Sequence, residues 1–210
     1  MHQNKISYAI TVCNEFAEIQ RLIDFLLTRK RVQDEIVVLF DSKNGDTAVE
    51  EYLRTHSLNG EFNWHSDAFD NHFADWKNKL TSLCSGDVVF QIDADEIPSE
   101  YLIEHLPEIL ESNPEIDVYL VPRINTVEGL TQAHIDKWHW QVNEDGWVNF
   151  PDYQCRIYKK NYKIAWINKV HEKLNGFDVY SALPAMKHYC ISHPKTIERQ
   201  EKQNSYYDTL

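Results

Sequence analysis

The chain has 210 residues, of which 42% are hydrophobic and 26% charged, a balance typical of a globular domain with one substantial core. Its net charge of −12 argues against a protein that coats nucleic acid or an anionic membrane through its general surface. The four cysteines are widely spaced without a Cys-x-x-Cys pair, and we find neither a signal peptide nor a run of about 18 apolar residues. These features predict a cytoplasmic protein without a transmembrane segment.

The first part of the chain alternates between predicted strands and predicted helices. Residues 6–12 and 36–40 are short apolar runs that predict buried strands, and residues 15–30 between them carry apolar side chains at helical spacing. The segment SKNGD then supplies turn chemistry, and Asp46 is predicted to cap a second helix that runs through about residue 53.

The same alternation continues as far as about residue 121. An apolar face at helical spacing predicts a helix over residues 73–83, and residues 88–92 and 118–121 predict buried strands. Ser99 is predicted to cap a helix that Pro107 and Pro114 interrupt. Continuous apolar strands that alternate with helices predict an α/β fold whose parallel sheet is covered on both faces.

Acidic side chains gather at the end of the predicted strand 88–92, where QIDADE places Asp93, Asp95 and Glu96 within four positions. Alternate residues of a strand share a face, so Asp93 and Asp95 are expected to point the same way and Ala94 the opposite way. A hard divalent cation such as Mg²⁺ or Mn²⁺ relieves the repulsion between two such carboxylates. The alternative is a solvated acidic loop whose charges complement the start of the next helix.

Other polar residues also follow predicted strands directly. Asn14 and Glu15 come after the first strand, and Asp41 ends the second. Ligands of parallel α/β sheets bind beyond the carboxyl ends of the strands. We therefore expect these three side chains and the Asp93–Glu96 cluster to meet at one edge of the sheet.

Several segments carry a resemblance to a known family, in this chain order: ITVCNE, VVLFDSKNGDT, HFADWKNKL, FQIDADE, DYQCRIYKKNYKIAWINKVHEKLNG and HPKTIERQE. They resemble family 2 glycosyltransferases of the GT-A fold, in particular short bacteriophage enzymes related to lipopolysaccharide-core glycosyltransferases. The resemblance implies a Rossmann-like α/β fold with a mixed, mostly parallel sheet flanked by helices, in a single domain over residues 1–210. Residues 1–122 would bind the nucleotide sugar, and residues 123–210 would face the acceptor and end in a helix from about residue 196.

The resemblance also implies roles for individual residues. Asp41 would read the edge of the nucleobase, and Asn14 and Glu15 would line the base or the ribose. Asp93 would contact the ribose or a metal ion, and Asp95 would bind the metal. The other positions expected to touch the nucleotide sugar are Lys77, Asn78, Ala94 and Arg156.

A metal cofactor, Mn²⁺ or Mg²⁺, is part of the same expectation. The family frequently supplies a histidine near the C-terminus as a further ligand, and KHYCISHPK offers His188 and His193. His193 is favoured because it immediately precedes the predicted final helix.

The family transfers the sugar with inversion in a single displacement, which needs one general base. Glu172, in VHE, is the expected base, and Asp152, in FPD, is the reserve candidate. The structural alternative for Glu172 is a salt bridge with Lys169 or Lys173.

The resemblance therefore predicts a metal-dependent hexosyl- or pentosyltransferase whose donor is a nucleotide-diphosphate sugar, with UDP as the family's most frequent carrier. The hydroxyl acceptor is either a hydroxymethylated pyrimidine in phage DNA or a saccharide. The aromatic segment WHWQVNEDGWVNF favours an acceptor platform or core packing, and the basic residues of 156–173 favour a phosphate-facing rim or a protected strand edge.

Two other functions compete with this prediction. A non-catalytic nucleotide-sugar-binding protein would keep the fold without turnover. A sugar-phosphate nucleotidyltransferase would normally carry a glycine-rich basic loop after the first strand, and ITVCNEF has none.

Overall fold

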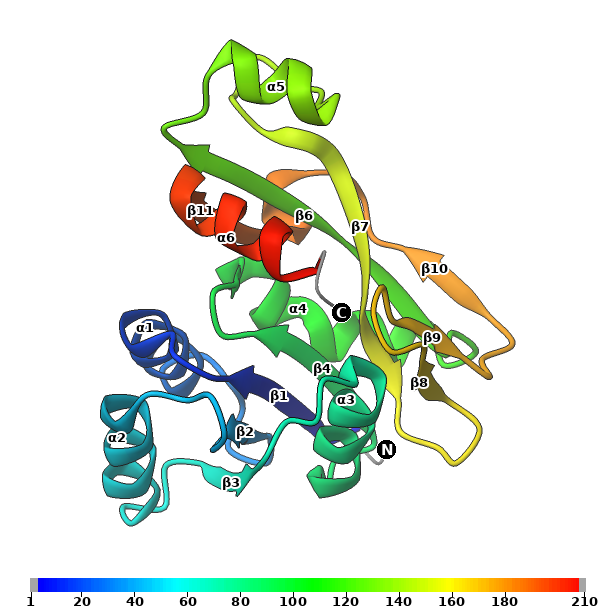
Figure 1. Ribbon diagram of the computed structural model, residues 1–210. Coiled ribbons are helices and arrows are strands. Elements are labelled where there is room, and N and C mark those ends of the chain that lie inside the picture. Colours follow the sequence, from blue (N-terminus) through cyan, green and yellow to red (C-terminus); the bar gives the residue numbers. More distant parts are fainter. Residues whose placement is uncertain (1–3, 208–210) are drawn as a thin grey trace.

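The computed structural model describes residues 4–207 (Figure 1). The strands in the first half of the chain are β1 (Ile6–Val12), β2 (Glu35–Asp41), β3 (Asn63–Asp67), β4 (Val88–Asp93) and β5 (Ile97–Pro98). Those in the second half are β6 (Val118–Glu128), β7 (Val148–Lys159), β8 (Ala165–Ile167), β9 (Lys173–Asn175), β10 (Tyr180–Ala182) and β11 (Ile191–Thr196). Nine of the strands from the two halves form one sheet. Its order is β3-β2-β1-β4-β7-β6-β11-β5, with β10 paired to β6, and β8 pairs separately with β9.

The large sheet is mixed and mostly parallel, which confirms the predicted fold class. Strands β1 to β4 run parallel to one another, and β7 enters between β4 and β6 in the antiparallel direction. Strands β10 and β11 pair parallel to β6, and the short β5 pairs antiparallel to β11. In Figure 1, β6 and β7 extend together well beyond the strands of the first half.

Helices cover both faces of the sheet. They are α1 (Phe16–Leu27), α2 (Thr47–Ser57), α3 (Phe73–Leu83), α4 (Glu100–Ser112), α5 (Gln132–Trp138) and α6 (Ile197–Tyr207), with a 3₁₀ turn η1 (Lys187–Tyr189). Tyr8 and Ile10 of β1 pack into one apolar cluster with α1, α2 and α4, whereas Ala9 between them packs into a second cluster with α3. The alternation of side chains along each strand thus builds two cores, one on each face.

One predicted helix boundary is wrong. Helix α4 passes through Pro107 and continues to Ser112, although the proline was expected to interrupt it. A proline inside a helix loses one backbone donor and crowds the preceding turn. Here Leu106 and Leu110, on either side of it, are buried in the core and hold the helix together.

The caps of the predicted helices differ in chemistry. Ser99 caps α4 as expected, because its side chain accepts a hydrogen bond from the Leu102 N–H at 3.1 Å. Asp46 occupies the capping position of α2, but its side chain makes no capping hydrogen bond. The final helix runs over Ile197–Tyr207, and the last part of its predicted range, residues 208–210, lies outside the described residues.

None of the helices formed by residues 4–207 is both long and apolar enough to cross a lipid bilayer.

Candidate active site

The carboxyl ends of three parallel strands lie side by side, as the strand pattern predicts. In the pairing of β1 with β4, Thr11 stands opposite Asp93, and Thr11 Oγ1 donates to Asp93 Oδ1 at 3.3 Å. On the other side of β1, Asp41 ends β2 one residue beyond the pairing of Val12 with Phe40. This edge is where α/β sheets of this kind bind ligands.

Asp93 is held by an arginine that is only 2% exposed, Arg156 on β7. Arg156 Nη2 donates to Asp93 Oδ2 at 2.6 Å and to Glu96 Oε1 at 2.5 Å, and Nη1 donates to Gln91 Oε1 at 2.5 Å. Burial alone would raise the pKa of Asp93, but the positive charges of Arg156 and Lys77 outweigh it and hold the pKa well below its usual range. The guanidinium of Arg156 therefore stabilises an ionised Asp93 from within the protein.

Asp95 faces other side chains than Asp93 does. Strand β4 ends at Asp93, and a turn closed by a 2.9 Å backbone hydrogen bond to the Asp93 carbonyl carries Asp95. This corrects the expectation that the two carboxylates share one face of a strand. Asp95 Oδ2 lies 3.2 Å from His193 Nε2 and 3.3 Å from Arg199 Nη2. Each carboxylate thus has its own set of basic partners, which relieves the repulsion between the two.

A second arginine ties the turn to the second half of the chain. Arg123 on β6 donates from Nη1 to Glu96 Oε1 at 3.0 Å, and from Nε and Nη2 to Asp152 Oδ2 at 2.9 and 2.6 Å. Asn125 Nδ2 donates to the same oxygen of Asp152 at 2.8 Å, and Gln154 Nε2 donates to Oδ1 at 2.7 Å. Burial would raise the pKa of Asp152, but the Arg123 charge and these hydrogen bonds outweigh it and lower the pKa. Asp152 is accordingly a weak proton acceptor.

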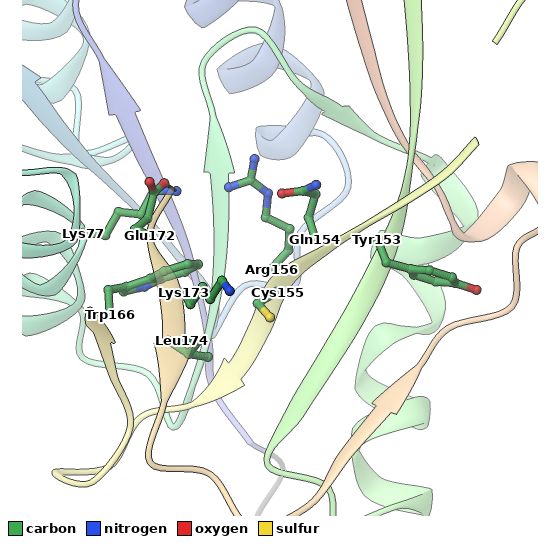
Figure 2. A pocket seen from close by; sticks show the side chains of 9 residues that line it. All are labelled: Lys77, Tyr153, Gln154, Cys155, Arg156, Trp166, Glu172, Lys173 and Leu174. Carbon is green, nitrogen blue, oxygen red and sulfur yellow. Dashed lines mark hydrogen bonds and ion pairs between the residues drawn. The ribbon is translucent and has the colours of Figure 1, made fainter. Parts of the chain in front are cut away.

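Arg156 also lines a cavity of about 290 Å³ (Figure 2). Lys77 Nζ lies 2.5 Å from Glu172 Oε1 and 4.6 Å from the centroid of the Trp166 ring. Figure 2 shows Lys77 and Glu172 side by side, with Arg156 on the facing side. Within the described residues, Glu172 makes its hydrogen bond through Oε1 alone. Glu172 thus forms a salt bridge, as in the structural alternative to its role as base, but its partner is Lys77 rather than Lys169 or Lys173.

Asp41 is largely occupied by the backbone around it. It is 5% exposed, and its Oδ1 accepts from the N–H groups of Lys43 at 2.9 Å and Phe69 at 3.1 Å. The turn that follows is so tight that a Cβ on Gly45 would lie 2.3 Å from the Asp41 carbonyl oxygen. Asp41 therefore shapes the loop at the end of β2, whatever else it contacts.

Asn78 and Glu15 also bond to the protein itself. Asn78 Nδ2 donates to the Trp166 carbonyl at 2.8 Å, and its Oδ1 accepts from the Trp166 N–H at 2.8 Å, so it clamps α3 to β8. Glu15 Oε2 accepts from the N–H of Asn14 at 3.0 Å, and Oε1 lies 3.2 Å from Arg199 Nη2. The Asn14 residue is exposed at the end of β1.

Two predicted site residues lie elsewhere. The His188 ring packs against Tyr101 and Tyr189, with centroids 4.8 and 4.5 Å away, and the His188 carbonyl accepts from Ser99 Oγ at 2.5 Å. His188 thus helps to pack η1 against α4, whereas His193 reaches Asp95. Ala94 is 3% exposed and belongs to the apolar core.

Asp95 and His193 are spaced like two adjacent ligands of a divalent metal ion. Among residues 4–207, no three His, Cys, Asp or Glu side chains converge to form a complete metal site. Two neighbouring ligands of an octahedral cation with bonds of about 2.1 Å lie roughly 3 Å apart, and Asp95 Oδ2 and His193 Nε2 are separated by 3.2 Å. Mg²⁺-type sites usually combine one or two protein ligands with waters and substrate phosphates, so two protein ligands suffice.

The fold and this edge define an α/β protein whose paired acidic and basic side chains lie at the carboxyl ends of a mostly parallel sheet. Comparison with known proteins gives the family. The profile of Glycosyl transferase family 2 matches residues 7–181. Since the match extends over most of the sequence, the chain belongs to this family. A search of curated proteins gave no significant match.

Solved structures with a similar fold include residues 1–349 of S. aureus TarS, with a TM-score of 0.58 and 14% identity over 89% of this chain and 60% of that one. The same fragment in complex with UDP-GlcNAc gives a TM-score of 0.60 and 14% identity, over 91% of this chain and 58% of that one. The complex of that fragment with UDP gives a TM-score of 0.53 and 13% identity, over 85% of this chain and 60% of that one. This chain therefore spans about three fifths of those fragments. At such low identity, the likeness establishes a GT-A-like fold and nothing about ligands.

Three further residues of the site, Arg123, Asn125 and Arg199, are not among those predicted from the sequence. Arg123 and Asn125 are two residues apart in the strand sequence VPRINTVE, which signals one shared face but not what lies opposite. Arg199 lies in the first turn of the final helix, and only the three-dimensional packing brings it to Glu15 and Asp95.

Proposed function

We propose that this chain is an inverting, metal-dependent glycosyltransferase that moves a sugar from a nucleotide-diphosphate sugar, with UDP as the first carrier to test, to a hydroxyl group. The observation that carries the proposal is the presence of two close pairs of ionisable side chains, one at the end of β4 and one in the cavity lined by Arg156. Asp95 Oδ2 lies 3.2 Å from His193 Nε2, and Lys77 and Glu172, paired at 2.5 Å, line a cavity together with Arg156. The family membership of the chain supports the same reaction class.

The donor would bind along the carboxyl edge of β1, β2 and β4. The exposed Asn14 and the loop shaped by Asp41 would receive the nucleoside, and Asp93 would face the ribose. When bound by Asp95 and His193, Mn²⁺ or Mg²⁺ supplies positive charge that neutralises the departing diphosphate. Arg199, 3.3 Å from Asp95, adds a further cation at the same place.

Glu172 is the proposed general base. The acceptor oxygen attacks the anomeric carbon as the bond from that carbon to the diphosphate oxygen breaks, and Glu172 takes the proton of the acceptor hydroxyl. Lys77 fixes the carboxylate through Oε1, which leaves Oε2 for the acceptor. Asp152, the reserve candidate, is less suited because both of its oxygens already accept hydrogen bonds and its pKa is lowered.

The acceptor would lie on the side of the second half of the chain. Four aromatic residues near α5 and the start of β7 lie outside both apolar cores and are incompletely buried: Trp138, Trp140, Trp147 and Phe150. Flat rings of this kind stack on sugars and on bases. The predicted basic rim is less continuous than the sequence suggested, because Arg156 is buried and Lys159 pairs with Asp117 at 3.1 Å. These observations favour a saccharide over phage DNA.

The test is to incubate the protein with a panel of nucleotide sugars and Mn²⁺, and to measure release of the nucleoside diphosphate. The active donor is then offered with glycan acceptors and with hydroxymethylated DNA, and the anomeric configuration of the product is read by NMR. We expect inversion and loss of activity on chelation of the metal. Calorimetric binding of a nucleotide sugar without any turnover would instead identify a non-catalytic binding protein.

A further inference from the structure

A line of polar side chains crosses three neighbouring strands beside Asp95. Arg123 on β6 stands opposite Asp152 on β7, and two residues further along β6, Asn125 stands opposite His193 on β11. The pairing of β6 with β7 is irregular between Arg123 and Asn125, and hydrogen bonds bring the four side chains together: Arg123 and Asn125 both bond to Asp152, and Asn125 bonds to His193. This line of side chains therefore connects Asp152, the reserve candidate for the general base, with His193, the predicted metal ligand.

The hydrogen bonds along this line have only one consistent direction. Asp152 is ionised and can only accept, so the Asn125 atom that lies 2.8 Å from Asp152 Oδ2 is the NH₂ nitrogen. The carbonyl oxygen of Asn125 therefore faces His193 Nδ1, 2.8 Å away. A carbonyl oxygen can only accept, so Nδ1 of His193 carries a proton.

The proton on Nδ1 determines whether Nε2 of a neutral His193 presents a proton or an electron pair to Asp95. In a neutral imidazole only one nitrogen carries a proton, so protonation of Nδ1 leaves Nε2 with a free electron pair. In the neutral ring that electron pair points at Asp95 Oδ2, 3.2 Å away, and the carboxylate is also an acceptor, whereas a charged ring donates from Nε2 to Asp95. A cation between the two atoms satisfies both, and metal-binding histidines are commonly oriented by such a hydrogen bond on the other nitrogen.

We propose that Asp152, acting through Asn125, is a positioning residue that keeps the proton of His193 on Nδ1 and turns the electron pair of Nε2 toward Asp95. Asp152 thus has a role other than that of general base. The statement about the proton depends on the hydrogen bonds alone. The statement that the electron pair serves a metal rests on the proposed function.

The first test reads the proton directly in the metal-free protein. The protein is labelled with ¹⁵N-histidine, and the His193 signals are identified by their absence in His193→Gln. At alkaline pH, where a histidine ring is neutral, wild type should show Nδ1 protonated. Asn125→Leu, which keeps the approximate size and removes the carbonyl, should move the proton to Nε2, where it can bond to Asp95.

A matched control is available on the same carboxylate. Gln154→Leu removes the hydrogen bond to Asp152 Oδ1 but leaves the bond from Asn125 to Oδ2 intact, so His193 should keep its wild-type signals. Thermal unfolding confirms that each variant is folded. If His193 carries its proton on the same nitrogen in wild type and Asn125→Leu, Asn125 does not position it and the proposal is wrong.

The second test measures Mn²⁺ affinity in the presence of UDP, with free Mn²⁺ counted by electron paramagnetic resonance. Asn125→Leu and Asp152→Asn should weaken binding by about 10- to 100-fold, the usual effect of removing a partner behind a metal-bound histidine. Gln154→Leu should bind as wild type does. Unchanged affinity in Asn125→Leu contradicts the positioning role. If wild type itself binds no Mn²⁺ with UDP, the proposed metal site fails, and the histidine spectra still decide where the proton lies.

Discussion

The two halves of the chain contribute differently to the candidate site. The first half, through β1, β2 and β4, supplies the edge of the sheet and the two carboxylates Asp93 and Asp95. The second half supplies most of the side chains that bond to those carboxylates, with Arg156 on β7 holding Asp93 and His193 on β11 facing Asp95. Its segment after β8 also supplies Glu172.

This difference shows that one part of the fold positions the strand ends and another part supplies the charged partners there. A parallel strand–helix framework fixes where the strand ends lie, and it does so through apolar packing on both faces. The charges at those ends are then set by β7, which runs antiparallel to β4 and carries Arg156, and by β11, which runs parallel to β6 and carries His193. Changes to the side chains of the second half that contact Asp93 and Asp95 should therefore affect chemistry, and changes far from the edge in the first half should affect stability alone.

The largest expected effect comes from Glu172→Gln. The variant keeps the side-chain volume and a hydrogen bond to Lys77 but cannot take a proton. We expect kcat to fall by about 10²- to 10⁴-fold, the range for loss of a general base. Calorimetry should show that the nucleotide diphosphate and Mn²⁺ still bind.

Asp152→Asn is the comparison for that variant. If Asp152 positions His193, its change should raise the Mn²⁺ concentration needed for activity, and saturating metal should restore much of kcat. The opposite outcome is full turnover in Glu172→Gln together with a loss of kcat in Asp152→Asn that saturating metal does not restore. That outcome would make Asp152, and not Glu172, the general base.

Arg156→Met tests the contact between the two halves. It leaves Asp93 without its arginine partner and removes one of the two arginines that bind the fully buried Glu96. Breaking a buried ion pair from one side costs about 3–5 kcal/mol, so the free energy of unfolding in urea should fall by that amount.

Lys159→Met is the matched control on the same strand. Lys159 pairs with Asp117 at 3.1 Å, but its side chain is 36% exposed, and such surface pairs contribute about 0–1 kcal/mol. If the free energy of unfolding falls equally in the two variants, the buried ion pairs of Arg156 contribute no more to stability than a surface pair does.

Glu35→Gln gives the smallest expected effect, at the opposite end of β2 from the site. Burial would raise the pKa of Glu35, but hydrogen bonds from Ser7, Ser85 and Lys5 outweigh it and lower the pKa from 4.5 to about 2. A carboxylate with a lowered pKa stabilises the folded state above its unfolded pKa, and this stability is lost as the pH falls.

The wild type should therefore lose stability between about pH 4.5 and 2, and Glu35→Gln should lose less over that interval, measured by urea unfolding at each pH. Sugar transfer at neutral pH should be unchanged in the folded variant. A transfer defect there would mean that the two ends of β2 are coupled, contrary to the division between framework and chemistry.

The sequence is informative about the framework because apolar periodicity and packing agree there. The run before Asp93 predicts a buried strand, and the spacing of Trp76 and Leu80 predicts the buried face of a helix; both are found buried. Pro107 shows the limit of local rules, since the core contacts of its neighbours outweigh the propensity of one residue.

The site is less readable because its contacts depend on register between distant strands. The spacing of Arg123 and Asn125 gives a common face, but nothing local indicates that Asp152 and His193 are the residues opposite. Likewise, the Asp-x-Asp spacing suggested a strand, and the turn after Asp93 became visible only in the structure.

The central claim is that Asp95 and His193 together hold the metal ion of the nucleotide-sugar site. The most direct measurement is a crystal structure with Mn²⁺ and UDP, in which anomalous scattering locates the manganese. The account predicts a single strong peak bonded to Asp95 Oδ2 and His193 Nε2, with the diphosphate of UDP completing its coordination. A peak away from both side chains, with UDP bound at the edge of the sheet, would contradict it.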